Sequence, residues 1–256
     1  MEGDTILVAQ GTYYENLIIQ KNITLTSNAI YDDLSNWVDY FEEYYVVNEN
    51  ITGTILNGSH DTNGDSLQSV IFIDSPDGDC IEPIIFGFTI TGGGGTVVLI
   101  EEDREIERET VEQKRGGGFL SRNALPKVRY NAIVNNKDDA QPINRGGGGD
   151  ETTGINVPTH PDYDWGSPRS ECTGELDLSY NFYSDNDALY GNTFSTLGFE
   201  GFVDMSNSVF DVYNCNEGEV TPVWVDVEEE VEVDFSYSAG DLCSITEDVW
   251  VSPDGD

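Results

Sequence analysis

Short β-branched segments separated by turn residues are the feature that most constrains the fold of this chain. Three such segments lie at 5–8, 16–19 and 22–26, and others at 84–91 and 128–134 end in polar turns in the same way. Segments of about five residues have the usual length of β-strands, and none of them buries a face alone. The pattern therefore predicts strands that gain stability by stacking on one another in a solenoid.

Three glycine clusters punctuate the middle of the chain. They lie at 92–95, 116–118 and 146–149, and their first residues are 24 and 30 residues apart, within the range of solenoid repeats. The clusters follow strands but precede no helical pattern, which indicates solenoid turns and not phosphate-binding loops. We expect successive rungs of the solenoid at the apolar segments around Leu17, Ile55, Ile71, Ile85, Ile133 and Phe182.

The segments GDTILVAQGTYYENLIIQKNITLTS, TILNGS, FGFTITGGGG and RGGGFLSRNALPKVRYNAIVNN resemble the repeats of pectin-lyase-like parallel β-helix proteins, especially large secreted proteins of marine bacteria. The resemblance covers residues 3–150 and continues more loosely through 176–214. It implies an all-β fold, a right-handed parallel β-helix. This fold carries lyases, hydrolases, adhesins and inert stalks, so the resemblance does not define an activity.

The expected β-helix spans residues 1–218, with insertions at about 29–53, 96–115 and 150–171. Apolar residues from Leu34 to Tyr44 fall at helical spacing, which predicts a short helix or a looped flap packed on the solenoid, with an aromatic sugar-binding platform as the alternative. The alternating charges of the second insertion fit either a helix or a projecting β-hairpin. The third reads as a long loop, rich in Pro, Thr and Asp.

The C-terminal region alternates valine or aromatic residues with acids between Val223 and Tyr237. This alternation predicts an acidic β-strand pair within an extension at 219–248, which caps or flanks the last rung. Residues 249–256 resemble the start of a following module or a linker. Both ends look unfinished, so we expect either a segment of a longer polypeptide or a protomer that joins its neighbours head to tail.

The charge of the chain limits its partners. Eleven basic residues against 49 acidic ones give a formal net charge of −38. Nucleic acids and anionic lipid surfaces are therefore excluded as expected partners, and no apolar run is long enough for membrane insertion. An acidic surface of this kind favours bound or screening cations.

Two acidic turns are candidate Ca²⁺ sites. Oxygen ligands stand on alternate residues around a glycine in each turn, although neither turn has the distal Glu of a complete EF-hand loop, and an ordinary Asx turn is the alternative. The predicted metal ligands are Asp61, Asn63, Asp65, Asp74, Asp77 and Asp79.

The four cysteines, Cys80, Cys172, Cys215 and Cys243, lack the close pairing of a zinc site. Together with N-x-S/T triplets at Asn22, Asn50 and Asn57, they favour disulfides and a secreted or cell-surface protein. The sequence leaves the disulfide pairing open.

Catalytic signals are weak. Polysaccharide lyases with a β-helix fold use a Lys or Arg base near a cation-neutralised uronate, and Arg122, Lys127 and Arg129 are the basic residues that could project from one rung. No lyase motif surrounds them, His60 and His160 read as loop residues, and we assign no catalytic or cofactor-binding residue. The leading hypothesis is a noncatalytic, adhesin-like module that contacts polysaccharides or cell-surface glycans. The alternatives are a polysaccharide-degrading lyase or glycosidase, and a stalk or fibre subunit that assembles end to end.

Overall fold

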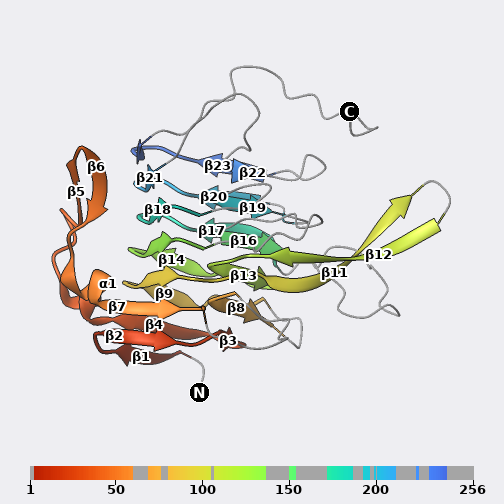
Figure 1. Ribbon diagram of the computed structural model, residues 1–256, viewed down its shortest axis with the longest axis horizontal. Coiled ribbons are helices and arrows are strands. Elements are labelled where there is room, and N and C mark those ends of the chain that lie inside the picture. Colours follow the sequence, from red (N-terminus) through yellow and green to blue (C-terminus); the bar gives the residue numbers. More distant parts are fainter. Residues whose placement is uncertain are drawn as a thin grey trace.

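The structure is a computed structural model. It describes residues 3–59, 69–75, 80–104, 107–136, 150–153, 172–186, 193–196, 199, 201–211, 223–224 and 231–240. In this part of the chain, strands dominate and most of them lie in three parallel sheets, which we name A, B and C (Figure 1). No helix in the same part is long and apolar enough to cross a membrane.

Among the described residues, sheets A and B each contain seven strands. The spatial order of sheet A is β1 (Asp4–Val8), β4 (Ile23–Ser27), β9 (Ile84–Phe86), β14 (Lys127–Arg129), β17 (Gly174–Asp177), β20 (Gly201–Asp204) and β23 (Val231–Asp234). The order of sheet B is β2 (Gly11–Tyr14), β7 (Thr54–Asn57), β10 (Thr89–Thr91), β15 (Ala132–Val134), β18 (Phe182–Ser184), β21 (Val209–Asp211) and β24 (Ala239–Gly240).

Sheet C contains six strands in the order β3 (Leu17–Ile19), β8 (Ile71–Asp74), β13 (Phe119–Arg122), β16 (Asp150–Thr153), β19 (Phe194–Thr196) and β22 (Val223–Trp224). The chain thus passes through A, B and C in the same order again and again, and we call each passage a circuit. We call the three sheets together the stack.

In the part of the chain that the structure describes, two short helices and two hairpins leave the stack. Residues 28–53, which we call the flap, contain η1 (Asn28–Tyr31), the antiparallel strands β5 (Val38–Phe41) and β6 (Glu43–Val46), and α1 (Glu49–Gly53). The second hairpin joins β11 (Thr96–Arg104) to β12 (Glu107–Arg115) and projects from the stack (Figure 1).

Positive-φ corners explain the repeated change of direction between sheets A and B. Five circuits place a residue with φ between 54° and 83° at this corner: Gly87, Tyr130, Tyr180, Asn207 and Tyr237. The residue after each of them turns inward. From Asn131 onward these inward residues are Asn or Ser, and their side chains accept backbone hydrogen bonds from the preceding circuit.

The resulting polar ladder is continuous. The backbone N of Phe88 donates to Asn131 Oδ1 at 3.0 Å, and the backbone N of Asn131 donates to Asn181 Oδ1 at 3.0 Å. The backbone N of Asn181 then donates to Ser208 Oγ at 3.1 Å. Because Asn131 and Asn181 are fully buried, these bonds satisfy groups that water does not reach.

A second ladder follows the corner between sheets B and C. The backbone N of Gly93 donates to Asn136 Oδ1 at 3.0 Å, and that of Asn136 donates to Asn186 Oδ1 at 3.1 Å. A Cβ on Gly93 would fall on the carbonyl oxygen of Gly117. The glycine clusters at 92–95 and 116–118 therefore meet in space, where the second hairpin leaves and rejoins the stack.

Apolar columns fill the interior between the ladders. Leu25, Ile85 and Val128 form one column of sheet A, with 6%, 0% and 1% of their surface exposed. In sheet B, the rings of Tyr183 and Phe210 stack with centroids 5.3 Å apart. In β9 and β14 the interior residue stands between two less buried neighbours, which agrees with the period-2 pattern of the sequence.

Several sequence predictions need correction. The helical spacing in the first insertion is misleading, because residues 38–46 form a β-hairpin around Glu42, whose φ of 65° makes the reversal. Residues 150–153 of the predicted third loop are strand β16, paired with β13 and β19. The remainder of that insertion, 154–171, lies outside the described residues.

The predicted C-terminal strand pair is wrong in its pairing. β22, β23 and β24 lie in three different sheets, and each continues the stack by pairing with the strand of the preceding circuit. The predicted rungs also need one change: all six segments are strands, but Ile55 in β7 and Ile71 in β8 belong to one circuit. Residues 249–256 lie outside the described residues.

Candidate functional site

The basic residues of strands β13 and β14 were the only candidates for a catalytic base. Arg122, at the end of β13, lies 3.2 Å from Asp74, its register partner on β8. Its guanidinium also stands over the ring of Phe72, 4.7 Å from the centroid. The side chains of this ion pair are only 12% and 18% exposed, so the pair is a shielded, mutually neutralised unit.

The other two basic side chains are also paired. Arg129 on β14 forms an ion pair with Asp177 on β17, and the hydrogen bond that the Arg129 guanidinium donates to Asp177 is the main cause that raises the pKa of Arg129 above its ordinary value. Lys127 lies 3.6 Å from Glu82 in a more exposed pair. A general base must lose its proton near the working pH, and a guanidinium held by a carboxylate does not.

The three basic residues also do not converge. Arg122 belongs to sheet C, whereas Lys127 and Arg129 belong to sheet A. The expectation that all three project from one rung therefore fails, because the chain turns a corner at Asn123, whose φ is 51°.

The predicted Ca²⁺ ligands lie mostly beyond what the structure describes. Asp61, Asn63, Asp65, Asp77 and Asp79 are outside the described residues, as are His60 and His160. The remaining ligand, Asp74, is occupied by Arg122. Within the described ranges, no group of three His, Cys, Asp or Glu side chains is arranged to hold a metal ion.

A column of aspartates on sheet A was missed by the sequence analysis. Asp177, Asp204 and Asp234 are register partners in adjacent strands, and each begins an Asp-x-Ser motif. The serine donates back to its aspartate, as in the 2.7 Å bond from Ser179 Oγ to Asp177. The repeated D-x-S motif was the available signal, and its bonds identify it as an Asx turn that ends each strand.

The flap has an inner face that contacts the stack. Val38 lies opposite Val46, and Tyr40, which is 60% exposed, lies opposite Tyr44 with the two tyrosine rings 4.8 Å apart. Val38, Tyr44 and Val46 pack with buried residues of sheet B, which include Ala132, Phe182 and Val209. The flap is therefore seated on the outside of sheet B (Figure 1).

Trp37 anchors the flap at its base. It is 7% exposed, and its ring meets that of Tyr130 edge-on at 5.6 Å. Tyr130 stacks in turn on Tyr180, with centroids 5.0 Å apart and an interplanar angle of 18°. Burial within this cluster raises the pKa of Tyr130.

The outer face of the flap is polar and aromatic. It presents the cross-strand pairs Asp39/Tyr45 and Phe41/Glu43, all of them exposed. Phe41 is 73% exposed and Tyr45 is 42% exposed. The predicted packing of the insertion on the stack is thus confirmed. The aromatic residues of the alternative prediction, a sugar-binding platform, do not share one face of the hairpin but lie on both.

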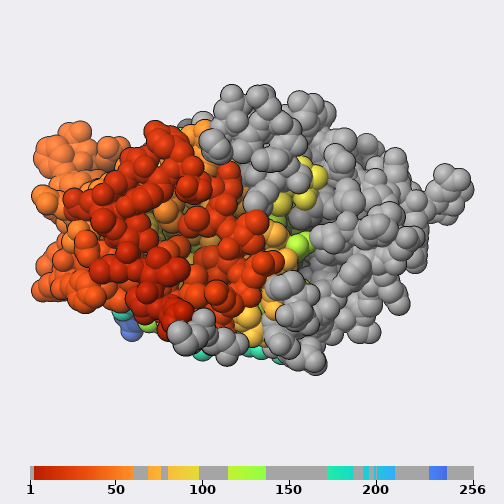
Figure 2. Space-filling view, turned by 90° about the horizontal axis from the view of Figure 1, so that it is seen from below, coloured from red at the N-terminus to blue at the C-terminus, as the bar shows by residue number. Residues whose placement is uncertain are grey.

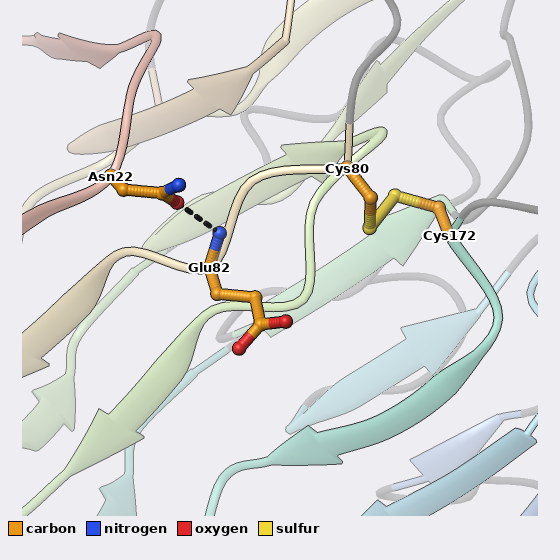
Figure 3. The surroundings of a disulfide bond; sticks show 4 residues. All are labelled: Asn22, Cys80, Glu82 and Cys172. Atoms are coloured by element: carbon orange, nitrogen blue, oxygen red, sulfur yellow. Dashed lines mark hydrogen bonds between the residues drawn. A yellow bond between two sulfur atoms is a disulfide. The ribbon is translucent and has the colours of Figure 1, made fainter. Parts of the chain in front are cut away.

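One disulfide crosses the stack beside these sites. Cys80, just before β9, is bonded to Cys172, just before β17 (Figure 3). The bond joins the segment that leads into the third circuit to the segment that leads into the fifth, with the two Cα atoms 5.1 Å apart. Nearby, the backbone N of Glu82 donates to Asn22 Oδ1 at 2.6 Å, which ties the same segment to the second circuit. Cys215 and Cys243 lie outside the described residues.

Comparisons with protein-family models, with curated proteins and with solved structures give no match for this chain.

Proposed function

We propose that this protein is a noncatalytic extracellular module, folded as a right-handed parallel β-helix, that holds loops and hairpins for contact with glycans or other molecules at a cell surface. The β-helix is supported by the repeated A, B, C order of the strands and by the positive-φ corners with their inward Asn and Ser ladders.

The observation that carries the noncatalytic assignment is the pairing of Arg122, Lys127 and Arg129 with Asp74, Glu82 and Asp177. A lyase needs a free base beside a neutralised uronate. These three pairs instead serve to join neighbouring circuits, because each links residues that are far apart in sequence.

The test is an assay of the purified chain against alginate, pectate and a neutral glucan, with and without Ca²⁺. We expect no unsaturated product and no new reducing ends. Depolymerisation that is lost in Lys127→Ala or Arg129→Ala, but kept in the exposed control Lys21→Ala, would establish the lyase instead.

The extracellular location is supported by the Cys80–Cys172 disulfide, because such bonds persist in oxidising compartments. The measurement is the thiol content of the chain isolated from its native source. A reduced Cys80 and Cys172 in that material would contradict the proposal.

Structural Ca²⁺ is part of the proposal and relies on Asp61, Asn63, Asp65, Asp77 and Asp79, since Asp74 is already paired. Cation binding to the native state raises the melting temperature. We expect a higher Tm in Ca²⁺ than in Na⁺ at equal ionic strength. An equal Tm would mean that cations act on this protein only by nonspecific charge screening.

A second candidate function, a fibre subunit that stacks end to end, is favoured by the N-terminal end of the stack. β1, β2 and β3 end the order of all three sheets among the described strands. Ile6 on β1 is 47% exposed, whereas its register partner Leu25 is 6% exposed. Figure 2 shows this end, where residues of the first circuits form the surface. Open edges and exposed interior positions favour pairing with a further circuit.

Light scattering separates the two candidates. A fibre subunit forms long particles as its concentration rises, and Ile6→Lys abolishes them. Particles of constant monomer size at all concentrations would remove the fibre candidate and leave the module.

A further inference from the structure

The outer face of the flap is an unpartnered sheet face with an unusual composition. On β5 it carries Asp39 and Phe41, and on β6 Glu43 and Tyr45. In this register each aromatic side chain lies opposite a carboxylate, so the two rings occupy one diagonal of the face and the two carboxylates the other. Cross-strand partners of this kind are about 5 Å apart.

The face is held in a fixed position. The inner side of the same hairpin packs on sheet B, and the backbone N of Val47 donates to the carbonyl of Trp37 at 2.8 Å, closing the base of the hairpin. The carboxylate of Asp39 is oriented by the backbone N of Tyr40 at 2.8 Å and by the hydroxyl of Tyr45 at 3.5 Å. Preorganised groups lose less entropy when a partner binds.

The outer face of the flap exposes aromatic rings. Phe41 is 73% exposed and Tyr45 is 42% exposed, and Tyr40, which belongs by register to the inner face, is 60% exposed. Within the described part of the chain, β5 and β6 form a sheet of two strands, so both outer edges of the hairpin lack a strand partner.

The charge around the face specifies what can cover it. The sequence contains no Lys or Arg between Asn22 and Asp103, while the flap contributes six carboxylates, at Asp32, Asp33, Asp39, Glu42, Glu43 and Glu49. A second copy of the chain would bring another net charge of −38 against it. Uronate or sulfated polymers, nucleic acids and anionic lipids are repelled for the same reason.

We propose that the outer face of the flap docks a basic segment of a partner polypeptide, through Arg or Lys side chains that stack on Phe41 and Tyr45 and pair with Asp39 and Glu43. Guanidinium and ammonium groups favour both an aromatic face and a carboxylate, and here the two alternate at side-chain spacing. A polypeptide also supplies backbone groups for the free edges of β5 and β6. This inference goes beyond the proposed module function and does not depend on it.

The test uses fluorescence anisotropy of labelled hexa-arginine with the full chain at low ionic strength. The aromatic variant is Phe41→Ser/Tyr45→Ser, and its matched control is Tyr14→Ser/Tyr237→Ser, which removes two exposed tyrosines elsewhere. The charge variant is Asp39→Asn/Glu43→Gln, and its control is Glu15→Gln/Glu175→Gln, which removes two exposed carboxylates outside the flap. Melting temperatures confirm that all four variants are folded.

We expect the aromatic variant to weaken binding by about five- to thirty-fold, the magnitude of two exposed cation–π contacts, and its control by less than about two-fold. The charge variant weakens binding more than its control. If the charge variant and its control weaken binding equally and the aromatic variant has no effect, hexa-arginine is held only by diffuse electrostatic attraction. That result would overturn the proposal. Preferential binding of an uncharged hexasaccharide that competes with hexa-arginine at Phe41 and Tyr45 would also overturn it, in favour of a glycan.

Discussion

The middle of the stack and the flap are held by different means. In the third to fifth circuits, buried Asn side chains bond backbone groups from one circuit to the next, and a disulfide spans the same region. The flap has no such ladder and is attached by the buried side chains of Ala29, Trp37 and Ile51, by the inner face of its hairpin and by the hydrogen bond that Thr89 Oγ1 donates to the carbonyl of Ile51 at 3.0 Å. An insertion of 26 residues between β4 and β7 is compatible with the fold, because it does not interrupt the interior hydrogen bonds between circuits.

The largest effect should follow removal of the disulfide in the middle of the stack. Cys80→Ser/Cys172→Ser frees a loop closed over 92 residues of sequence, which we expect to cost about 4 kcal/mol of unfolding free energy. Chemical denaturation of the variant measures this cost. Reductant should lower the stability of the wild type toward that of the variant, and an unchanged midpoint in both would show that the disulfide does not support the stack.

The next effect concerns the polar ladder. Asn181→Ala removes the bonds from Asn181 Nδ2 to the carbonyls of Val128 (2.7 Å) and Leu178 (2.8 Å), and leaves the backbone N of Asn131 unpaired. Unsatisfied buried groups cost about 1–3 kcal/mol each, so we expect a loss of about 3 kcal/mol. The exposed control Asn36→Ala should change stability by less than about 0.5 kcal/mol. Equal losses in the two variants would contradict the ladder's role.

The flap should respond locally and not globally. Trp37→Ala removes the edge contact with Tyr130, and we expect faster amide exchange at 38–46 while exchange in β15 and β18 stays unchanged. Hydrogen exchange with mass spectrometry resolves these segments. Faster exchange throughout β15 and β18 would mean that the flap is an integral part of the stack.

The smallest effect is acid loosening at the base of the flap. Hydrogen bonds from Asn50 and Asn48 lower the pKa of Asp32 below its ordinary value of 3.8. A lowered folded-state pKa gives stability that is present above the ordinary pKa and is lost as the pH falls through the folded pKa. The Trp37 indole signal in NMR spectra should therefore broaden or shift below about pH 4. Asp32→Asn removes this titration, and an identical pH profile in that variant would assign the change to other groups.

Much of the stack could be predicted from the sequence, because period-2 alternation and turn residues are local signals. The segments around Leu17, Ile85 and Ile133 are strands as expected. The assignment of Ile55 and Ile71 to separate rungs failed since one circuit holds three strands, and sequence spacing does not reveal how many strands form a circuit.

The candidate site was less predictable because it depends on contacts between distant residues. The ion pair between Arg129 and Asp177 joins residues 48 positions apart in the sequence, and no local motif predicts it. In the flap, apolar residues from Leu34 to Tyr44 matched a helix, but Glu42 adopts a left-handed conformation and the hairpin is fixed by packing against sheet B. Tertiary contacts overrode the local periodicity.

The most direct test of the account is to replace residues 28–53 with a two-residue Gly-Asn corner, as short as the link from β9 to β10, and to measure hydrogen exchange across the stack. Because the Asn and Ser ladders and the column of Leu25, Ile85 and Val128 contain no residue of the flap, we predict a cooperative fold with unchanged protection in β9, β14, β15 and β18, together with loss of hexa-arginine binding. Loss of protection throughout these strands would contradict it, because the flap would then be required for the stack to form.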